Sequence, residues 1–145
     1  MKTSVILATL AITVCASAQA IDLSGEWKVV AAKSQGAIAI TSGNKSPHVT
    51  DFPAGDKHIT AETPAASLPF VLKINSQKGN SFHGQWCSPK KCEKAAGVIR
   101  KDGTILMVDD DSTYLATMYG SEMELCVTQP GKSIRMAICH MMEKN

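Results

Sequence analysis

Four cysteines carry the clearest chemical signal in this chain after its first twenty residues. They are spaced as C-x4-C and C-x12-C, at Cys87, Cys92, Cys126 and Cys139. Neither spacing is that of a zinc ribbon or a zinc finger. An even number of cysteines in an exported chain favours disulfides, so we predict two bridges and no zinc site.

Two other groups of residues have the donor atoms of a metal site. His140 lies among Met136, Met141 and Met142, whose soft sulfur atoms suit Cu(I). Strand alternation, however, sends Met141 to the face opposite His140, so these donors do not converge. The run Asp109–Asp111 offers oxygen ligands but lacks the glycine and the glutamate spacing of an EF-hand loop. We therefore expect no metal ion and interpret the acidic run as a solvated turn.

Catalysis is not indicated by the remaining polar residues. His48 and His58 flank Asp51 and Asp56 in a segment rich in proline and glycine, which is poorly suited to hold a catalytic group rigidly. The sequence contains no Gly-x-Ser-x-Gly, His-Glu-x-x-His or phosphate-loop motif. We predict a protein that is not an enzyme and that uses no cofactor.

The N-terminal residues have the pattern of a secretory signal peptide. Lys2 precedes a short apolar run, and Ala18-Gln19-Ala20 forms a small-x-small cleavage site. We expect residues 1–20 to be removed, leaving one secreted or periplasmic domain over residues 21–145. Without Lys2 the chain has 14 basic and 13 acidic residues, which argues against nucleic acid as a partner. No stretch is long and apolar enough to predict a membrane span.

The elements that position these residues are short runs in which apolar and polar residues alternate, a pattern typical of antiparallel strands. A two-residue loop at Gly120-Ser121 sets apolar residues opposite one another on one face. Extending the register past Pro130-Gly131 sets Cys126 against Cys139 on the other face, so these two can form a bridge. Cys87–Cys92 then closes a second hairpin tip. The apolar pairs of the first hairpin are Met118–Met123, Ala116–Leu125 and Tyr114–Val127.

Two glycines decide whether the apolar face continues through the earlier hairpins. A three-residue loop ending at Gly103 sets Ile99 against Ile105, and the same device at Gln77-Lys78-Gly79 sets Ile74 against Phe82. We choose these bulged turns because they keep one continuous interior face.

This pattern predicts an all-β fold, an antiparallel up-and-down barrel of about eight strands with two disulfides. Residues 41–69 lack the alternation and predict a long loop with one short strand near 57–60. The loop contains a glycosylation sequon at Asn44, which is also explained as a chance match. Small residues such as Gly97 leave room inside, although a fully packed interior stays open at this point. The predicted ligand-binding residues are Trp27, Phe70, Leu72, Phe82, Trp86, Tyr114, Met118, Leu125 and His140.

The outward face carries an unexpected apolar patch. The chosen register brings Val98, Leu106, Val108 and Leu115 together on three adjacent strands. Two interpretations remain: the long loop or a terminus covers the patch, or it binds another protein or a second copy of the chain.

The opening Ser24-Gly25-Glu26-Trp27 resembles the Gly-x-Trp entrance of the calycin superfamily, which includes lipocalins, avidins and secreted bacterial metalloprotease inhibitors. The resemblance implies that Trp27 plugs the closed end of an eight-stranded barrel. Our leading hypothesis, which rests on the mixture of aromatic and small residues on the interior face, is an exported barrel that binds a small apolar or amphipathic ligand inside. The alternative that the resemblance implies is an inhibitor of an exported protease or hydrolase, whose segment Ile21-Asp22-Leu23, or whose long loop, enters the enzyme.

Overall fold

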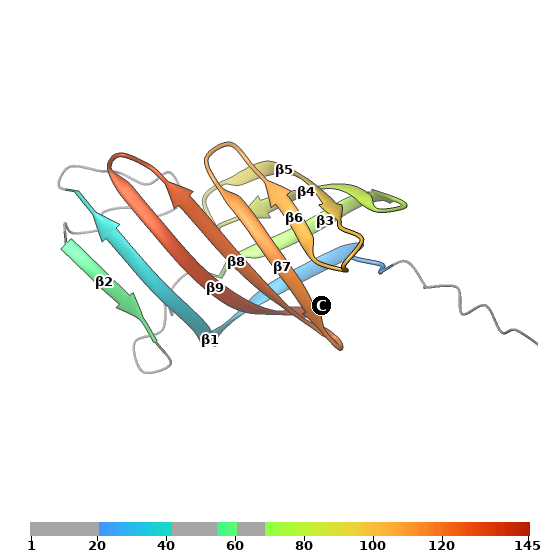
Figure 1. Cartoon of the computed structure of the whole chain (residues 1–145), viewed down its shortest axis with the longest axis horizontal. Helices are drawn as coiled ribbons and strands as arrows, with labels where there is room; N and C mark the ends of the chain where they lie inside the picture. Colours follow the sequence, from blue (N-terminus) through green and yellow to red (C-terminus); the bar gives the residue numbers. More distant parts are fainter. Residues whose placement is uncertain (1–20, 42–54, 61–68) are drawn as a thin grey trace, which may run out of the picture.

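The computed structural model describes residues 21–41, 55–60 and 69–145, and within them every regular element is a β-strand (Figure 1). The predicted all-β fold is therefore confirmed. The predicted signal peptide and Asn44 lie outside the described residues. The nine strands are β1 Gly25–Ile40, β2 Gly55–Ile59, β3 Val71–Lys78, β4 Ser81–Cys87, β5 Cys92–Ile99, β6 Ile105–Val108, β7 Thr113–Tyr119, β8 Glu122–Pro130 and β9 Ile134–Lys144.

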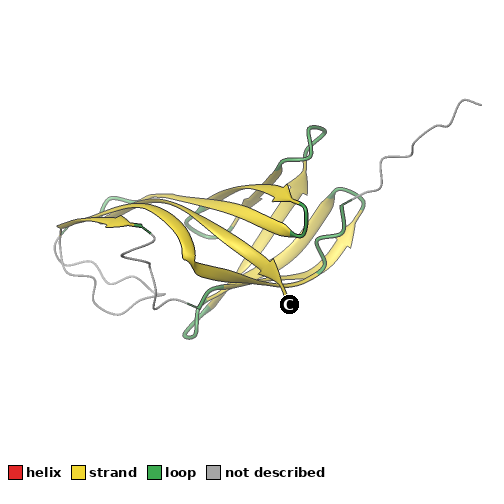
Figure 2. Cartoon of the chain, turned by 90° about the horizontal axis from the view of Figure 1, so that it is seen from below, coloured by secondary structure: helices red, strands yellow, loops and turns green. Residues whose placement is uncertain are grey.

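The strands close into an eight-stranded antiparallel barrel because β1 has a partner on each side. The first part of β1 pairs with β3, and β1 also pairs with β9 from Trp27 to Val30 and from Gln35 to Ile40. Strands β3 to β9 connect these two partners in sequence order. Closure removes the exposed edges that an open sheet would present. Figure 2 shows the sheet curling back on itself.

Strand β2 is the ninth member of the sheet and lies outside the closed circuit. It pairs only with the second half of β1, from Gly36 to Ile40, where β1 has already left β3. The short strand expected near residues 57–60 is thus present; it begins two residues earlier and ends one residue earlier.

The predicted pairings of the later hairpins are confirmed. Tyr114 faces Val127, Ile99 faces Ile105, and Cys126 faces Cys139. Gly103 has a φ of 83°, in the left-handed region that a three-residue bulged loop requires. Both predicted disulfides, Cys87–Cys92 and Cys126–Cys139, are present.

The β3–β4 hairpin corrects one prediction. Its loop is the pair Gly79-Asn80, with Lys78 opposite Ser81, so Ile74 faces Gly84 and not Phe82. The register shifts by one residue between Ile74 and Ser76, where the structure has a β-bulge. A bulge restores the alternation that a two-residue loop would have inverted. The interior residues were therefore predicted correctly, although their partners were not.

The buried hydrophobic residues form one cluster, which also includes Ile59 of β2. The part of the chain that the structure describes contains no helix that is long and apolar enough to cross a membrane. The two disulfides are compatible with an exported protein.

Candidate functional site

One end of the barrel is closed by the residues that precede β1. The side chain of Leu23 is fully buried, and the indole Nε1 of Trp27 donates a hydrogen bond to the Leu23 carbonyl at 2.9 Å. The amide of Gln77 accepts from the Leu23 nitrogen at 2.9 Å and donates to the Ile21 carbonyl at 2.7 Å. Of the predicted partner segment Ile21-Asp22-Leu23, Leu23 therefore packs inside its own barrel, whereas Asp22 is exposed at the surface.

The interior next to this closed end is filled with side chains. A Cβ atom added at Gly97 would lie 2.1 Å from Cζ of Phe82, so the aromatic ring occupies the space that the glycine was expected to leave. Other predicted ligand-binding residues, Trp27, Leu72 and Leu125, are at most 2% exposed. A ligand would need the opposite end, which we call the distal end: the end formed by the β4–β5, β6–β7 and β8–β9 turns.

Four of the predicted ligand-binding residues form an aromatic wall toward the distal end. The rings of Phe70 and Trp86 are stacked, with centroids 5.1 Å apart. Trp86 also lies 5.6 Å from the ring of Tyr114 and 6.4 Å from the ring of His140. These rings come from the segment before β3 and from β4, β7 and β9, so the barrel assembles the wall from four separate parts of the chain.

The imidazole of His140 has a buried polar partner that strand pairing alone would not provide. Strand β1 bulges between Val30 and Gln35, and the bulge places the Ser34 hydroxyl 2.8 Å from His140 Nδ1. Both side chains are buried. Burial lowers the pKa of His140 from 6.5 to about 4, so the ring is neutral at pH 7. Among the described residues, none forms a hydrogen bond with Nε2, the other ring nitrogen.

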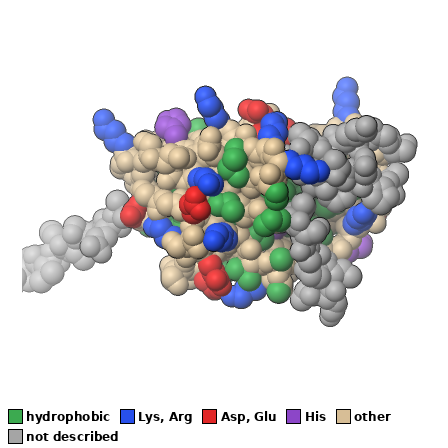
Figure 3. All heavy atoms as spheres, turned by 180° about the vertical axis from the view of Figure 1, so that it is seen from behind, with side chains coloured by type: hydrophobic (Ala, Val, Ile, Leu, Met, Phe, Trp, Pro, Cys, Tyr) green, Lys and Arg blue, Asp and Glu red, His purple; other side chains and the backbone are tan. Residues whose placement is uncertain are grey.

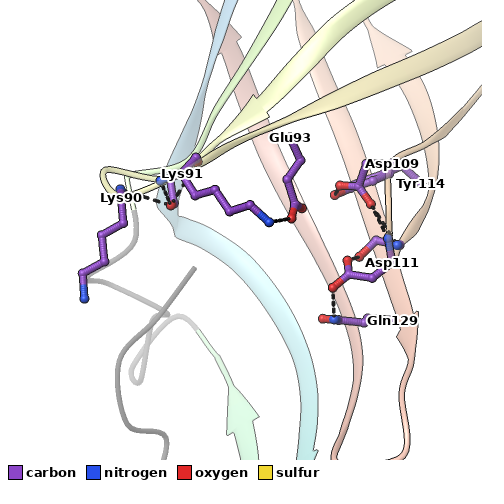
Figure 4. A network of polar contacts seen from close by, with 9 residues as sticks. Lys90, Lys91, Glu93, Asp109, Asp111, Tyr114 and Gln129 are labelled. Atoms are coloured by element: carbon purple, nitrogen blue, oxygen red, sulfur yellow. Dashed lines mark hydrogen bonds and ion pairs between the residues drawn. The ribbon is translucent and has the colours of Figure 1, made fainter. Parts of the chain in front are cut away.

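An acidic cluster continues the wall to the surface of the distal end (Figure 4). Carboxylate oxygens of Glu93, Asp109 and Asp111 all lie within 4.8 Å of one another. The Lys91 ammonium pairs with Glu93, whose side chain is only 3% exposed. Asp111 accepts from the Gln129 amide at 2.6 Å. These three carboxylates are close enough together to hold a cation, and the Lys91 ammonium lies beside them.

Asp109 joins the acidic cluster to the aromatic wall. Its carboxylate accepts a hydrogen bond from the hydroxyl of Tyr114. Burial raises the pKa of Asp109, although the Tyr114 hydrogen bond acts in the opposite direction. Burial, with the adjacent Asp109, also raises the pKa of Tyr114 far above its usual value, so the phenol stays protonated and donates.

Sequence reasoning missed three residues of this site: Ser34, Lys91 and Glu93. Alternation could have found Glu93, which lies two residues before the interior Ala95 on the same strand and faces Trp86 on β4. A glutamate at an interior position indicates either a functional site or a buried ion pair. The acidic run was read as a solvated turn, whereas Asp109 turns inward to Tyr114.

Comparison of the chain with protein-family models, with curated proteins and with solved structures found no match. The resemblance to calycins therefore stays a prediction.

The predicted outer patch lies where the register placed it. Leu106 faces Val98 on one side and Leu115 on the other. With Val108, these side chains are between 40% and 49% exposed, so the described residues leave them largely uncovered. Figure 3 shows that hydrophobic side chains also reach the surface between charged groups on the face hidden in Figure 1.

Proposed function

We propose that this protein is a non-enzymatic barrel that binds one small amphipathic ligand at the distal end of its interior. The observation that carries the proposal is the aromatic wall of Phe70, Trp86, Tyr114 and His140, which ends at buried polar groups. Apolar walls with a few convergent polar groups are the usual composition of small-molecule sites. The wall would cover the apolar part of a ligand, and the Nε2 atom of His140 would contact its polar part.

The closed end supports the same assignment. Because Trp27, Phe82 and Leu23 fill that end, the ligand would enter only between the distal turns. Side chains fill the closed end, and polar groups surround the distal end. This arrangement would orient an amphipathic molecule with its apolar part toward the closed end.

The proposal is tested with Nile red, a neutral hydrophobic dye whose fluorescence rises in an apolar site. We expect saturable binding by the exported protein at one site, with affinity reduced roughly tenfold in Trp86→Leu because the stacked ring is lost. Tyr119→Leu is the matched control, since Tyr119 is an aromatic residue that is 57% exposed at the closed end. A protein with a ligand-free native mass that takes up no dye would contradict the proposal.

A second candidate function is that of a protein-interaction module. The exposed patch favours it, and consists of Val98, Leu106, Val108 and Leu115. An exposed apolar patch on three adjacent strands is typical of a binding surface. If the patch binds a second copy, the sedimentation coefficient should rise with protein concentration, and Leu106→Ser with Leu115→Ser should abolish the rise. A monomer at all concentrations would reject the second copy as the partner.

A further inference from the structure

We infer that the exposed patch on β5, β6 and β7 binds the same patch of a second copy of this chain, about a two-fold axis that runs parallel to β6 and β7 and passes between them. The inference rests on the second candidate function and names its partner. Three features of the outer surface support it: the patch carries no charge, it is symmetric about the line between β6 and β7, and opposite charges lie at its two borders.

The patch lies in a region of the outer surface without charged side chains. The outward residues beside it are Ala96 on β5, Thr113 on β7, and Cys126 and Thr128 on β8. None of these side chains is ionisable, because Cys126 is part of a disulfide. Burying apolar surface is favourable, whereas burying an unpaired charge is strongly unfavourable. Another apolar surface can therefore cover this region at little cost.

The patch is symmetric about the line between β6 and β7, which are neighbours in the sheet (Figure 1). Leu106 on β6 and Leu115 on β7 face each other in this strand pair, and they are 40% and 49% exposed. A two-fold axis along the line places Leu106 of one copy against Leu115 of the other, and the reverse contact follows by symmetry. The same axis places Val98 on β5 against Cys126 on β8 of the second copy. Two sheets that pack in this way keep their strands nearly aligned, which is a common arrangement.

The charges at the two borders of the patch are complementary across this axis. Arg100 follows β5 two residues after Val98, and Glu124 lies on β8 two residues before Cys126. Because the axis brings Val98 of one copy to Cys126 of the other, it also brings Arg100 of one copy to Glu124 of the other. This contact between opposite charges occurs twice in the dimer.

A two-fold axis perpendicular to the strands would not pair these charges. An axis along the row of the two leucines places Arg100 against Ala96, and Glu124 against Thr128, of the second copy. Each charge would then face an uncharged side chain and lose water without gaining a partner. Electrostatic complementarity therefore favours the axis that is parallel to the strands.

Both border charges are free to form the contact. The Arg100 guanidinium lies 3.3 Å from the carboxylate of Asp102 in its own turn, but both side chains are more than half exposed. An exposed ion pair of this kind contributes little, and a guanidinium has more donors than one carboxylate uses. Glu124 forms no ion pair with any residue that the structure describes.

The test is sedimentation velocity of the natural protein and of charge-exchange variants over a range of concentrations. We expect the sedimentation coefficient of the natural protein to rise to that of a dimer. Arg100→Glu and Glu124→Arg should each weaken association roughly tenfold, because each variant brings like charges together twice. The double variant Arg100→Glu with Glu124→Arg should restore association, because it exchanges the two charges across the axis.

Lys132→Glu is the matched control for net charge. It makes the same change of charge as Arg100→Glu, at an exposed residue of the β8–β9 turn, at the opposite end of β8 from Glu124. It should leave association unchanged. Nile red binding by every variant reports whether the variant is folded and tests the ligand-binding proposal separately.

The possible outcomes separate this inference from the function on which it rests. A monomer at all concentrations would overturn the inference and leave a different protein as the partner of the patch. A dimer that Leu106→Ser with Leu115→Ser abolishes, but that the double charge exchange does not restore, would overturn the proposed axis while supporting the patch as a binding surface. A dimer that survives the two leucine substitutions uses another surface, and it would overturn the inference and remove the support for the second candidate function.

Discussion

The hydroxyl oxygen of Ser34 lies 2.8 Å from Nδ1 of His140, although the two residues are 106 positions apart in the sequence. Strand β1 reaches this position only because it bulges opposite His140. The bulge thus gives a buried imidazole a polar partner at the distal half of the barrel, next to Trp86. This pair has a measurable consequence for stability.

We predict that the free energy of unfolding falls in acid because of His140. Burial lowers its pKa from 6.5 to about 4, so between these pH values the unfolded chain binds a proton that the folded chain does not. The contribution of His140 to the free energy of unfolding is complete above pH 6.5 and is lost as the pH falls through about 4. This contribution is about 3 kcal/mol. Urea titrations at several pH values measure it.

The matched variant for this prediction is His140→Asn, which keeps a polar group but does not titrate. Its stability should change less between pH 7 and pH 4 than that of the natural protein. Asp109 has a raised pKa and acts in the opposite direction, but it is present in both proteins and cancels in the comparison. Identical pH slopes would contradict the burial of a neutral His140.

A second prediction concerns the contact between Gly97 and Phe82. Gly97→Ala should destabilise the fold by about 1–3 kcal/mol, because the new methyl group would overlap the Phe82 ring. Phe82→Leu in the same chain should recover part of this loss by freeing the space. A double-mutant cycle measured by thermal unfolding gives the coupling. Strictly additive effects would mean that the two residues do not touch.

A third prediction tests whether residues 21–23, which precede β1, pack inside the barrel or protrude from it. Leu23→Ala should cost about 2–5 kcal/mol, because it removes a fully buried side chain from the closed end. Asp22→Ala is the neighbouring control, and its exposed side chain should matter little. Equal, small effects of both substitutions would indicate that the segment does not pack inside the barrel.

The fourth prediction ranks the two disulfides. The Cys126–Cys139 bridge spans 13 residues and the Cys87–Cys92 bridge spans 5. Because a longer loop loses more chain entropy when it is closed, replacing the first pair by alanine should cost about 3 kcal/mol and replacing the second about 2 kcal/mol. Urea unfolding of the two double variants tests the order. A larger loss for the Cys87–Cys92 pair would contradict the entropic argument.

The sequence by itself determined which side chains face inward. Strand residues alternate between two faces, so a hairpin with a recognisable turn assigns every residue of its strands, as Gly120-Ser121 does for Tyr114 and Val127. The same parity placed both cysteines of the Cys126–Cys139 bridge on the outer face. These are local properties, because a turn and an alternation involve only neighbouring positions.

Only the tertiary structure decided which inward residues meet. The bulge near Ile74 changed the partners in the β3–β4 hairpin without changing their faces. The bulge in β1 brought the Ser34 hydroxyl to His140 on β9. The segment that precedes β1 folds back so that the side chain of Leu23 is buried in the core. The physical reason is that curvature, bulges and closure depend on how all strands pack together, whereas alternation depends on one strand alone.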